Sequence, residues 1–344
     1  MWPYIVTRLL SGLLMLFAMT LLTFSVFRLI PLPAGCLVVP CGPNTFTTDA
    51  QIRAAEHKLG ADQSVPVQYG KFVWRIVRHG SFGRAWTGGS IDQSLRAALP
   101  RTASVLFGGI VLLLLLAIPL GAWSAMRRDT LIDRAVLLFA IFGIALHPML
   151  VGVGLVRFFS HTLHLFPEGV YCHFMPVKQP PRPAFLLPSA PPPECGGPLA
   201  WAHHLVLPWL TFALFFLPLY VRMIRARFLE TLDSQYVMAA RGRGVSEFRL
   251  IRSHALRPAL MPLVTMVGLD LGGALMAVIY IETIYGLSGV GSLMLGSLGT
   301  SAGAYDLPLI AALFFVIASF AIFVTFVVDV TYAWLDPRVR IAET

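Results

Sequence analysis

The segment Tyr236–Pro262, YVMAARGRGVSEFRLIRSHALRPALMP, lies between two apolar stretches and decides how the chain is organised. It is basic and too polar to cross a bilayer. Within it, Ala239 and Ala240 are followed after three residues by Gly244, and His254 comes after nine more. Small side chains allow another surface to approach a helix closely, and glycine allows the bend that ends a helix. The segment therefore predicts a docking helix for a cytoplasmic partner, presented by a membrane protein.

The composition is that of a membrane protein. The 344 residues are 57% hydrophobic and 12% charged, and the mean hydropathy is +0.75, which excludes a soluble globular chain. His147-Pro148 predicts a kink in the third apolar run, because proline interrupts helical hydrogen bonding. Runs long enough to cross about 30 Å of hydrocarbon predict an all-α fold with transmembrane helices. These helices are expected over residues 9–30, 102–125, 135–159, 205–221, 259–281 and 307–334.

Arginines gather on one side of the predicted spans. The positive-inside rule makes that side cytoplasmic and places both termini there. The net charge of +9 alone would suggest nucleic acid as a partner, but this placement argues against it. The first run has no clear cleavage site, so we expect it to stay in the mature protein. The arginines concerned are Arg8, Arg127, Arg128, Arg134, Arg222, Arg225, Arg227, Arg241, Arg243, Arg249, Arg252, Arg257, Arg338 and Arg340.

The four cysteines all lie in loops predicted to face outward. Disulfides persist in an oxidising compartment, and loop proximity favours the pairs Cys36–Cys41 and Cys172–Cys195. A zinc site that combines the cysteines with nearby histidines is the alternative. His161 and His164 have the helical spacing of metal ligands, but no carboxylate lies between them and the pattern arises easily by chance. We therefore predict no metal site.

Two outer helices are predicted between the first and second spans. Thr48 and Gln51 form a capping-box pattern, and Gly60 suits the end of that helix. A second helix is expected over 64–79, closed by Gly80. Its apolar stripe is expected to cover the ends of the membrane helices, with a membrane-surface anchor as the alternative. The stripe consists of Tyr69, Phe72, Val73, Ile76 and Val77.

Several motifs occur in a fixed order along the chain. They are GSFGR at 80–84, IPLG at 118–121, Asp133-Arg134, LPLYVRMIRARFLETLDSQYV at 217–237, AARGRG at 239–244, IETIYGLSGVG at 281–291 and LDPRVR at 335–340. With these motifs the chain resembles the permease subunits of the dipeptide, oligopeptide and nickel class of ABC importers over nearly its whole length. It departs from that pattern at Met238, where an acidic residue is usual, and at Leu287-Ser288 near the outer mouth.

The resemblance implies a type I ABC-importer fold with an outer helical insertion, in a bacterial inner membrane. It implies a second, homologous permease, two cytoplasmic ATPases and an extracytoplasmic binding protein as partners. The sequence lacks the phosphate-cradling G-x-x-x-x-G-K-[ST] loop. We therefore expect ATP and magnesium on the partner chains, no cofactor on this chain, and no enzymatic activity. Di- or oligopeptides are the expected solutes, with nickel or another small solute as the alternative.

The resemblance also implies a division of the chain. We expect an N-terminal transmembrane helix over 1–31, an extracytoplasmic helical segment over 32–101, a five-helix permease core over 102–335 and a cytoplasmic tail over 336–344. Within the core, residues 228–258 would form the coupling loop.

Three groups of residues are candidates for the site. Coupling to the ATPases is expected from Tyr236, Ala239, Ala240, Arg241, Gly244, Glu247 and His254, although the arginine alone could serve topology. The outer loop that reaches toward the binding protein is expected to include Tyr285, Gly286, Gly289, Gly291, Tyr305 and Asp306. The third group consists of carboxylates in the fifth span.

Asp270 lies near the middle of that span, where a carboxylate costs about 2.5–3.5 kcal/mol. We expect it to line the translocation path and attract a cationic group of the solute. A hydrogen bond to the second permease is the alternative. Glu282, nearer the end of the span, is assigned to the same path, with contact to interfacial water as the alternative.

Two other classes of protein are alternative interpretations of the sequence. An integral membrane enzyme, such as a metal-dependent protease, would need a ligand set at bilayer depth, and the sequence offers none. A secondary transporter would have no use for the docking segment and would usually contain inverted repeats.

Overall fold

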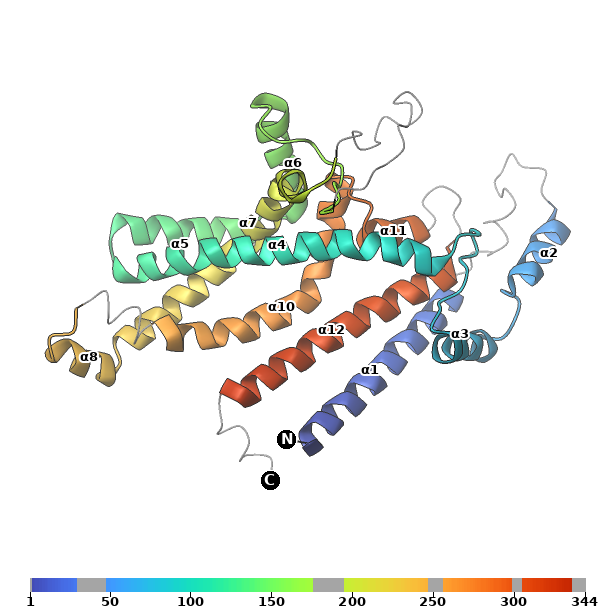
Figure 1. The fold of residues 1–344 in the computed structure, drawn as a ribbon, viewed down its shortest axis with the longest axis horizontal. Helices are drawn as coiled ribbons and strands as arrows, with labels where there is room; N and C mark the ends of the chain where they lie inside the picture. Colours follow the sequence, from blue (N-terminus) through green and yellow to red (C-terminus); the bar gives the residue numbers. More distant parts are fainter. Residues whose placement is uncertain (1, 30–47, 176–194, 247–255, 299–304, 336–344) are drawn as a thin grey trace. The chain divides into compact units, whose positions relative to one another are not determined.

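The computed structural model describes residues 2–29, 48–175, 195–246, 256–298 and 305–335, and the regular elements in those ranges are all helices, joined by loops that contain two isolated bridges. The all-α prediction is thereby confirmed (Figure 1). The helices are α1 (Trp2–Leu29), α2 (Asp49–Leu59), α3 (Val65–His79), α4 (Ile91–Met126), α5 (Leu131–Ile144), α6 (Pro148–Leu155), a π-helical turn (Val156–Thr162), α7 (Pro198–Leu232), α8 (Gln235–Gly242), α10 (Leu256–Ile284), α11 (Val290–Ser297) and α12 (Leu307–Leu335).

Among the described residues, five helices are long and apolar enough to span a membrane, namely α1, α4, α7, α10 and α12. The third predicted span differs from a simple kinked helix. It is a pair, α5 and α6 with its π-helical turn, bent by 109°. The break falls at His147, whose ring Nδ1 accepts a hydrogen bond from the backbone N–H of Met149 at 3.2 Å. Pro148 opens the new helix, where its missing N–H leaves no bond unmade.

The helices form two compact units. Unit 1 consists of residues 1–100 and 289–344, and unit 2 consists of residues 101–288. Helix α4 contributes its residues up to Pro100 to unit 1 and the remainder to unit 2. The division predicted from the sequence concerns the two sides of a membrane, and it stays a prediction.

In unit 1, α1 packs against α12, and α3 lies beside α1 (Figure 1). The Tyr69 hydroxyl of α3 lies 3.0 Å from the Thr20 hydroxyl of α1. The Tyr69 and Phe72 rings both pack on Phe24, with centroids 5.5 and 5.4 Å away. The aromatic side chains of α3 therefore fix it to the C-terminal half of α1.

Local sequence signals predicted the outer helices well. The capping box of Thr48 and Gln51 is present, and Gly60 and Gly80 end α2 and α3 with φ of 70° and 58°. Fewer residues of the predicted apolar stripe on α3 are buried than the sequence pattern indicates. Tyr69 and Phe72 are buried, whereas Val73 and Val77 are 36% and 76% exposed. The expectation that all five stripe residues cover membrane helices is therefore wrong for these two valines, because they turn away from α1.

Unit 2 is built around α7, which packs against α5, α6 and α10. Glycines of α4 also let it approach the side chains of α7 closely. A Cβ atom at Gly108 would overlap the Trp209 ring, and one at Gly109 would lie 2.6 Å from the Phe212 ring. Small residues allow such close helix packing inside a membrane, where no hydrophobic effect drives helices together.

Candidate coupling and translocation site

Helix α8 contains most of the residues expected to couple the chain to an ATPase. Two residues separate it from the end of α7, and its Val237 side chain is completely buried. On a helix with 3.6 residues per turn, Ala239 and Gly242 lie on the side opposite Val237. Both are exposed, and a Cβ atom at Gly242 would meet no atom within 4 Å. Helix α8 thus buries Val237 in unit 2 and carries the small residues Ala239 and Gly242 on its exposed side.

The end of α8 has the geometry predicted for Gly244. The backbone N–H of Gly244 donates to the Arg241 carbonyl at 3.0 Å, and that of Val245 donates to the Ala240 carbonyl at 3.3 Å. These two bonds form a Schellman motif, which requires a left-handed residue after the helix. Gly244 supplies it with φ +80°. Glu247 and His254, the remaining coupling candidates, lie outside the described residues.

A buried ion pair holds the helices that lead to α8. The Arg225 guanidinium of α7 contacts both carboxylate oxygens of Asp133 on α5, with Nε–Oδ1 at 2.6 Å and Nη2–Oδ2 at 2.7 Å. The Ser124 hydroxyl of α4 donates to the same carboxylate at 2.6 Å. Asp133 is 2% exposed. Sequence reasoning treated Arg225 only as a topology signal and missed this pairing.

Apolar packing joins the same helices nearby. Phe228 of α7 and Ala125 of α4 form a buried cluster with Leu229 and Leu232. The last turns of α7 are therefore fixed to the end of α4, and α8 follows directly. The contacts of α7 with α4 therefore extend to Leu232, the last residue of α7 before the short link to α8.

Asp270 is half-buried and bonded within the chain. The Tyr220 hydroxyl of α7 donates to Asp270 Oδ2 at 2.8 Å. Beside them lies a pocket of only about 10 Å³, lined mainly by apolar side chains that include Phe212, Phe216 and Leu271. That volume is about one water molecule. This pocket is therefore too small to hold a solute.

Glu282 is completely buried in unit 2, where the Thr102 hydroxyl of α4 donates to its Oε1 atom. Its contact joins α10 to α4.

The outer-loop candidates are mostly buried. Gly286 is exposed, whereas Tyr285, Gly289, Gly291, Tyr305 and Asp306 are buried, the first in unit 2 and the other four in unit 1. The Tyr285 hydroxyl bonds to the Thr211 hydroxyl at 2.8 Å. The Asp306 carboxylate accepts from the backbone N–H groups of Thr87 at 2.9 Å and Leu309 at 3.2 Å. Asp306 thus caps α12 and holds the 86–87 turn, and its contact with a binding protein stays a prediction.

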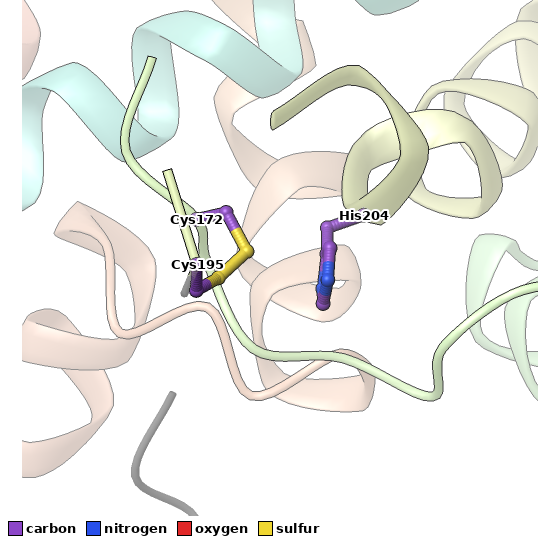
Figure 2. A group of neighbouring side chains, drawn as sticks. All are labelled: Cys172, Cys195 and His204. Atoms are coloured by element: carbon purple, nitrogen blue, oxygen red, sulfur yellow. A yellow bond between two sulfur atoms is a disulfide. The ribbon is translucent and has the colours of Figure 1, made fainter. Parts of the chain in front are cut away.

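Unit 2 contains a disulfide between Cys172 and Cys195, the pairing favoured by loop proximity. Figure 2 shows the His204 ring beside it, and the sulfur atoms and a ring nitrogen lie within 4.8 Å of one another. Metal binding requires thiolates, and sulfur atoms joined to each other do not supply them. Cys36 and Cys41 lie outside the described residues.

The long apolar helices of the described residues, with the short basic helix α8 between α7 and α10, are typical of a multi-pass membrane protein. The chain belongs to the family of binding-protein-dependent transport system inner membrane components, which matches residues 117–341. The N-terminal part of that family matches residues 1–88.

Curated relatives align over almost the full length. The "Probable D,D-dipeptide transport system permease protein DdpB" of Escherichia coli K12 is 32% identical, covering 98% of this chain and 97% of the relative. A "peptide permease protein" of Brucella suis is 29% identical, covering 99% and 100%. A "peptide ABC transporter permease protein" of Sinorhizobium fredii is 26% identical with the same coverage.

The family fixes the general role of the chain. It is a non-catalytic permease component of an ABC transport system in the inner membrane. A system of this family also includes an ATPase and a binding protein. The predicted family and the predicted absence of catalysis by this chain are confirmed on that basis.

Proposed function

We propose that the chain is the permease subunit of an ATP-driven importer for di- or oligopeptides in a bacterial inner membrane. The printed functions of its full-length relatives support peptides over the alternative, nickel or another small solute. A secondary transporter is disfavoured, because α8 offers a close-approach surface that such a protein would not use.

The proposed complex contains a second, homologous permease, two ATPase domains that carry ATP and magnesium, and an extracytoplasmic binding protein. Both termini and α8 lie in the cytoplasm, as the placement of the arginines indicates. The narrow pocket at Asp270 supports a path shared with the second permease. The proposal that α8 couples the chain to an ATPase rests on its small exposed residues, which lie opposite the buried Val237.

Two substitutions at Gly244 test whether the shape of the α8 end matters for ATPase binding. Valine is expected to weaken co-purification of the ATPase, because a left-handed conformation costs a side chain about 1–2 kcal/mol. Asparagine adopts this conformation more readily and should retain binding. Both side chains have room in this chain, since nothing lies within 4 Å of the added Cβ. Equal loss in both variants would instead indicate a purely steric contact, and equal retention would contradict the role of this bend.

We also propose that Asp270 faces the translocation path and attracts the amino group of a peptide. Asp270→Asn keeps an oxygen for the Tyr220 hydroxyl and removes the charge. Because a hydrogen bond to a charged group is worth about 1.5–3 kcal/mol, uptake of a peptide with a free amine should fall about tenfold or more. Uptake of its N-acetylated form should change little. Unaltered uptake of both peptides, with unaltered stability, would rule out this role.

A further inference from the structure

Unit 1 contains a cavity of about 460 Å³ that lies outside the coupling and translocation site. It opens between α2, α3, the segment 82–86 and the start of α12. Phe24 of α1 contributes to its wall. The other aromatic side chains of the wall are Phe72, Phe82 and Trp86. This volume is within the range of ordinary ligand sites.

The cavity lies at the level where a membrane helix leaves the bilayer. The apolar span of α1 ends at Val26, two residues beyond Phe24. Helix α3 reaches deeper still, because the Tyr69 hydroxyl bonds to Thr20. At 1.5 Å per residue, Thr20 lies about 9 Å inside the end of that span. The cavity wall is therefore at headgroup depth on the side where α1 ends.

The cavity is also cationic. Its charged residues include Lys58, Lys71, Arg75 and Arg84, and no carboxylate is among the described residues that line it. Lys71 donates to the Gln63 side chain at 2.7 Å, and Arg75 contacts the Phe82 carbonyl at 3.4 Å. The side chains of Lys58 and Arg84 make no hydrogen bond or ion pair with any described residue. An arrangement of like charges of this kind favours an anion.

The exposed face of α3, next to the cavity, carries apolar side chains. Val67, Trp74 and Val77 are 46%, 63% and 76% exposed, and they follow one another at helical spacing. An amphipathic helix with exposed tryptophan and valine beside lysine and arginine is typical of a helix lying in the membrane interface.

We propose that this basic cavity binds the phosphate-bearing headgroup of an anionic phospholipid, whose acyl chains run along α1 and α12. The cations match the phosphate, and the aromatic wall at headgroup depth matches the glycerol and the upper acyl chain. The inference rests on the proposed topology, because that topology makes this side the outer leaflet. A free phosphate ion would use only the cations and leave the aromatic wall without a role.

The test compares two matched double variants in the complete transporter. Lys58→Gln with Arg84→Gln removes two cations from the cavity. Arg53→Gln with Arg78→Gln removes two exposed cations of α2 and α3 that do not line it. Each complex is extracted from membranes that contain phosphatidylglycerol and phosphatidylethanolamine, and the retained lipid is quantified by mass spectrometry.

The wild-type complex and the Arg53/Arg78 variant should retain phosphatidylglycerol in preference to phosphatidylethanolamine. The Lys58/Arg84 variant should lose that preference about thirtyfold, because each of the two interfacial cations contributes about 1 kcal/mol to anionic lipid binding. An excess of inorganic phosphate should leave the retained lipid in place. Displacement by phosphate, no lipid preference in the wild type, or equal loss in both variants would overturn the proposal. Weaker binding-protein affinity in the Lys58/Arg84 variant with an unchanged lipid preference would do the same.

Peptide uptake and ATPase co-purification are measured on the same preparations. If the wild-type complex imports peptide but shows no lipid preference, the lipid site fails and the proposed function stands. If it retains anionic lipid but binds no ATPase, the proposed function fails instead.

Discussion

Replacing Arg225 with methionine is expected to destabilise unit 2 by about 3–5 kcal/mol, because it leaves a buried carboxylate without its counter-ion. The Asp133 side chain is 2% exposed, and Arg225 contacts both of its oxygens. The Ser124 hydroxyl and one backbone N–H would remain as donors, but neither carries a charge. Thermal unfolding of the purified protein, followed by circular dichroism, measures the loss.

The double variant Arg225→Met with Asp133→Leu separates an unpaired charge from lost packing. Replacing a whole buried ion pair with apolar residues is often close to neutral, so most of the stability should return. Arg227→Met is the control, because Arg227 pairs with Glu230 at the surface, where both side chains are at least half exposed. That change should cost no more than about 1 kcal/mol. If the double variant were as unstable as Arg225→Met alone, the charge argument would be wrong.

The sequence alone predicted the structural features that depend on residues close together in the chain. The capping box at Thr48, the left-handed glycines at Gly60 and Gly80, and the bend at Gly244 were all predicted, and each depends on residues within one helical turn. Apolar run length predicted the membrane helices for the same reason. The sharp break at His147 was predicted only as a kink, because its angle depends on how α6 packs against α7 and α10.

The side-chain contacts of the candidate site could not be predicted in the same way, because they join residues that are distant in sequence. Asp133 and Arg225 are 92 residues apart, and Tyr220 and Asp270 are 50 apart. No local pattern links either pair. Asp306 is different, because Asp-Leu-Pro at 306–308 is a helix-start pattern that the sequence already contained. This pattern predicts the capping role of Asp306 in its own chain, in addition to the expected contact with a binding protein.

Replacing Ala239 with tryptophan is expected to abolish ATPase binding and nucleotide-driven uptake while the chain remains folded. Ala239 is exposed and lies opposite the buried Val237, so this chain has room for the larger ring. A closely docked partner would not, because overpacking a well-fitted contact costs about 1–3 kcal/mol or more. Co-purification of the ATPase with the permease complex measures the first effect, and uptake into vesicles loaded with ATP measures the second.

Leu131→Trp is the matched control. Leu131 begins α5 and is 82% exposed, so the same bulk is added to unit 2 on a different helix. It should leave ATPase binding and uptake unchanged. Circular dichroism and accumulation in the membrane should be the same for both variants. Because α8 follows directly on the α7 turns that are packed against α4, lost docking should also uncouple hydrolysis from transport. Full ATPase recruitment by the Ala239→Trp complex would show that the partner contacts a different face of the chain.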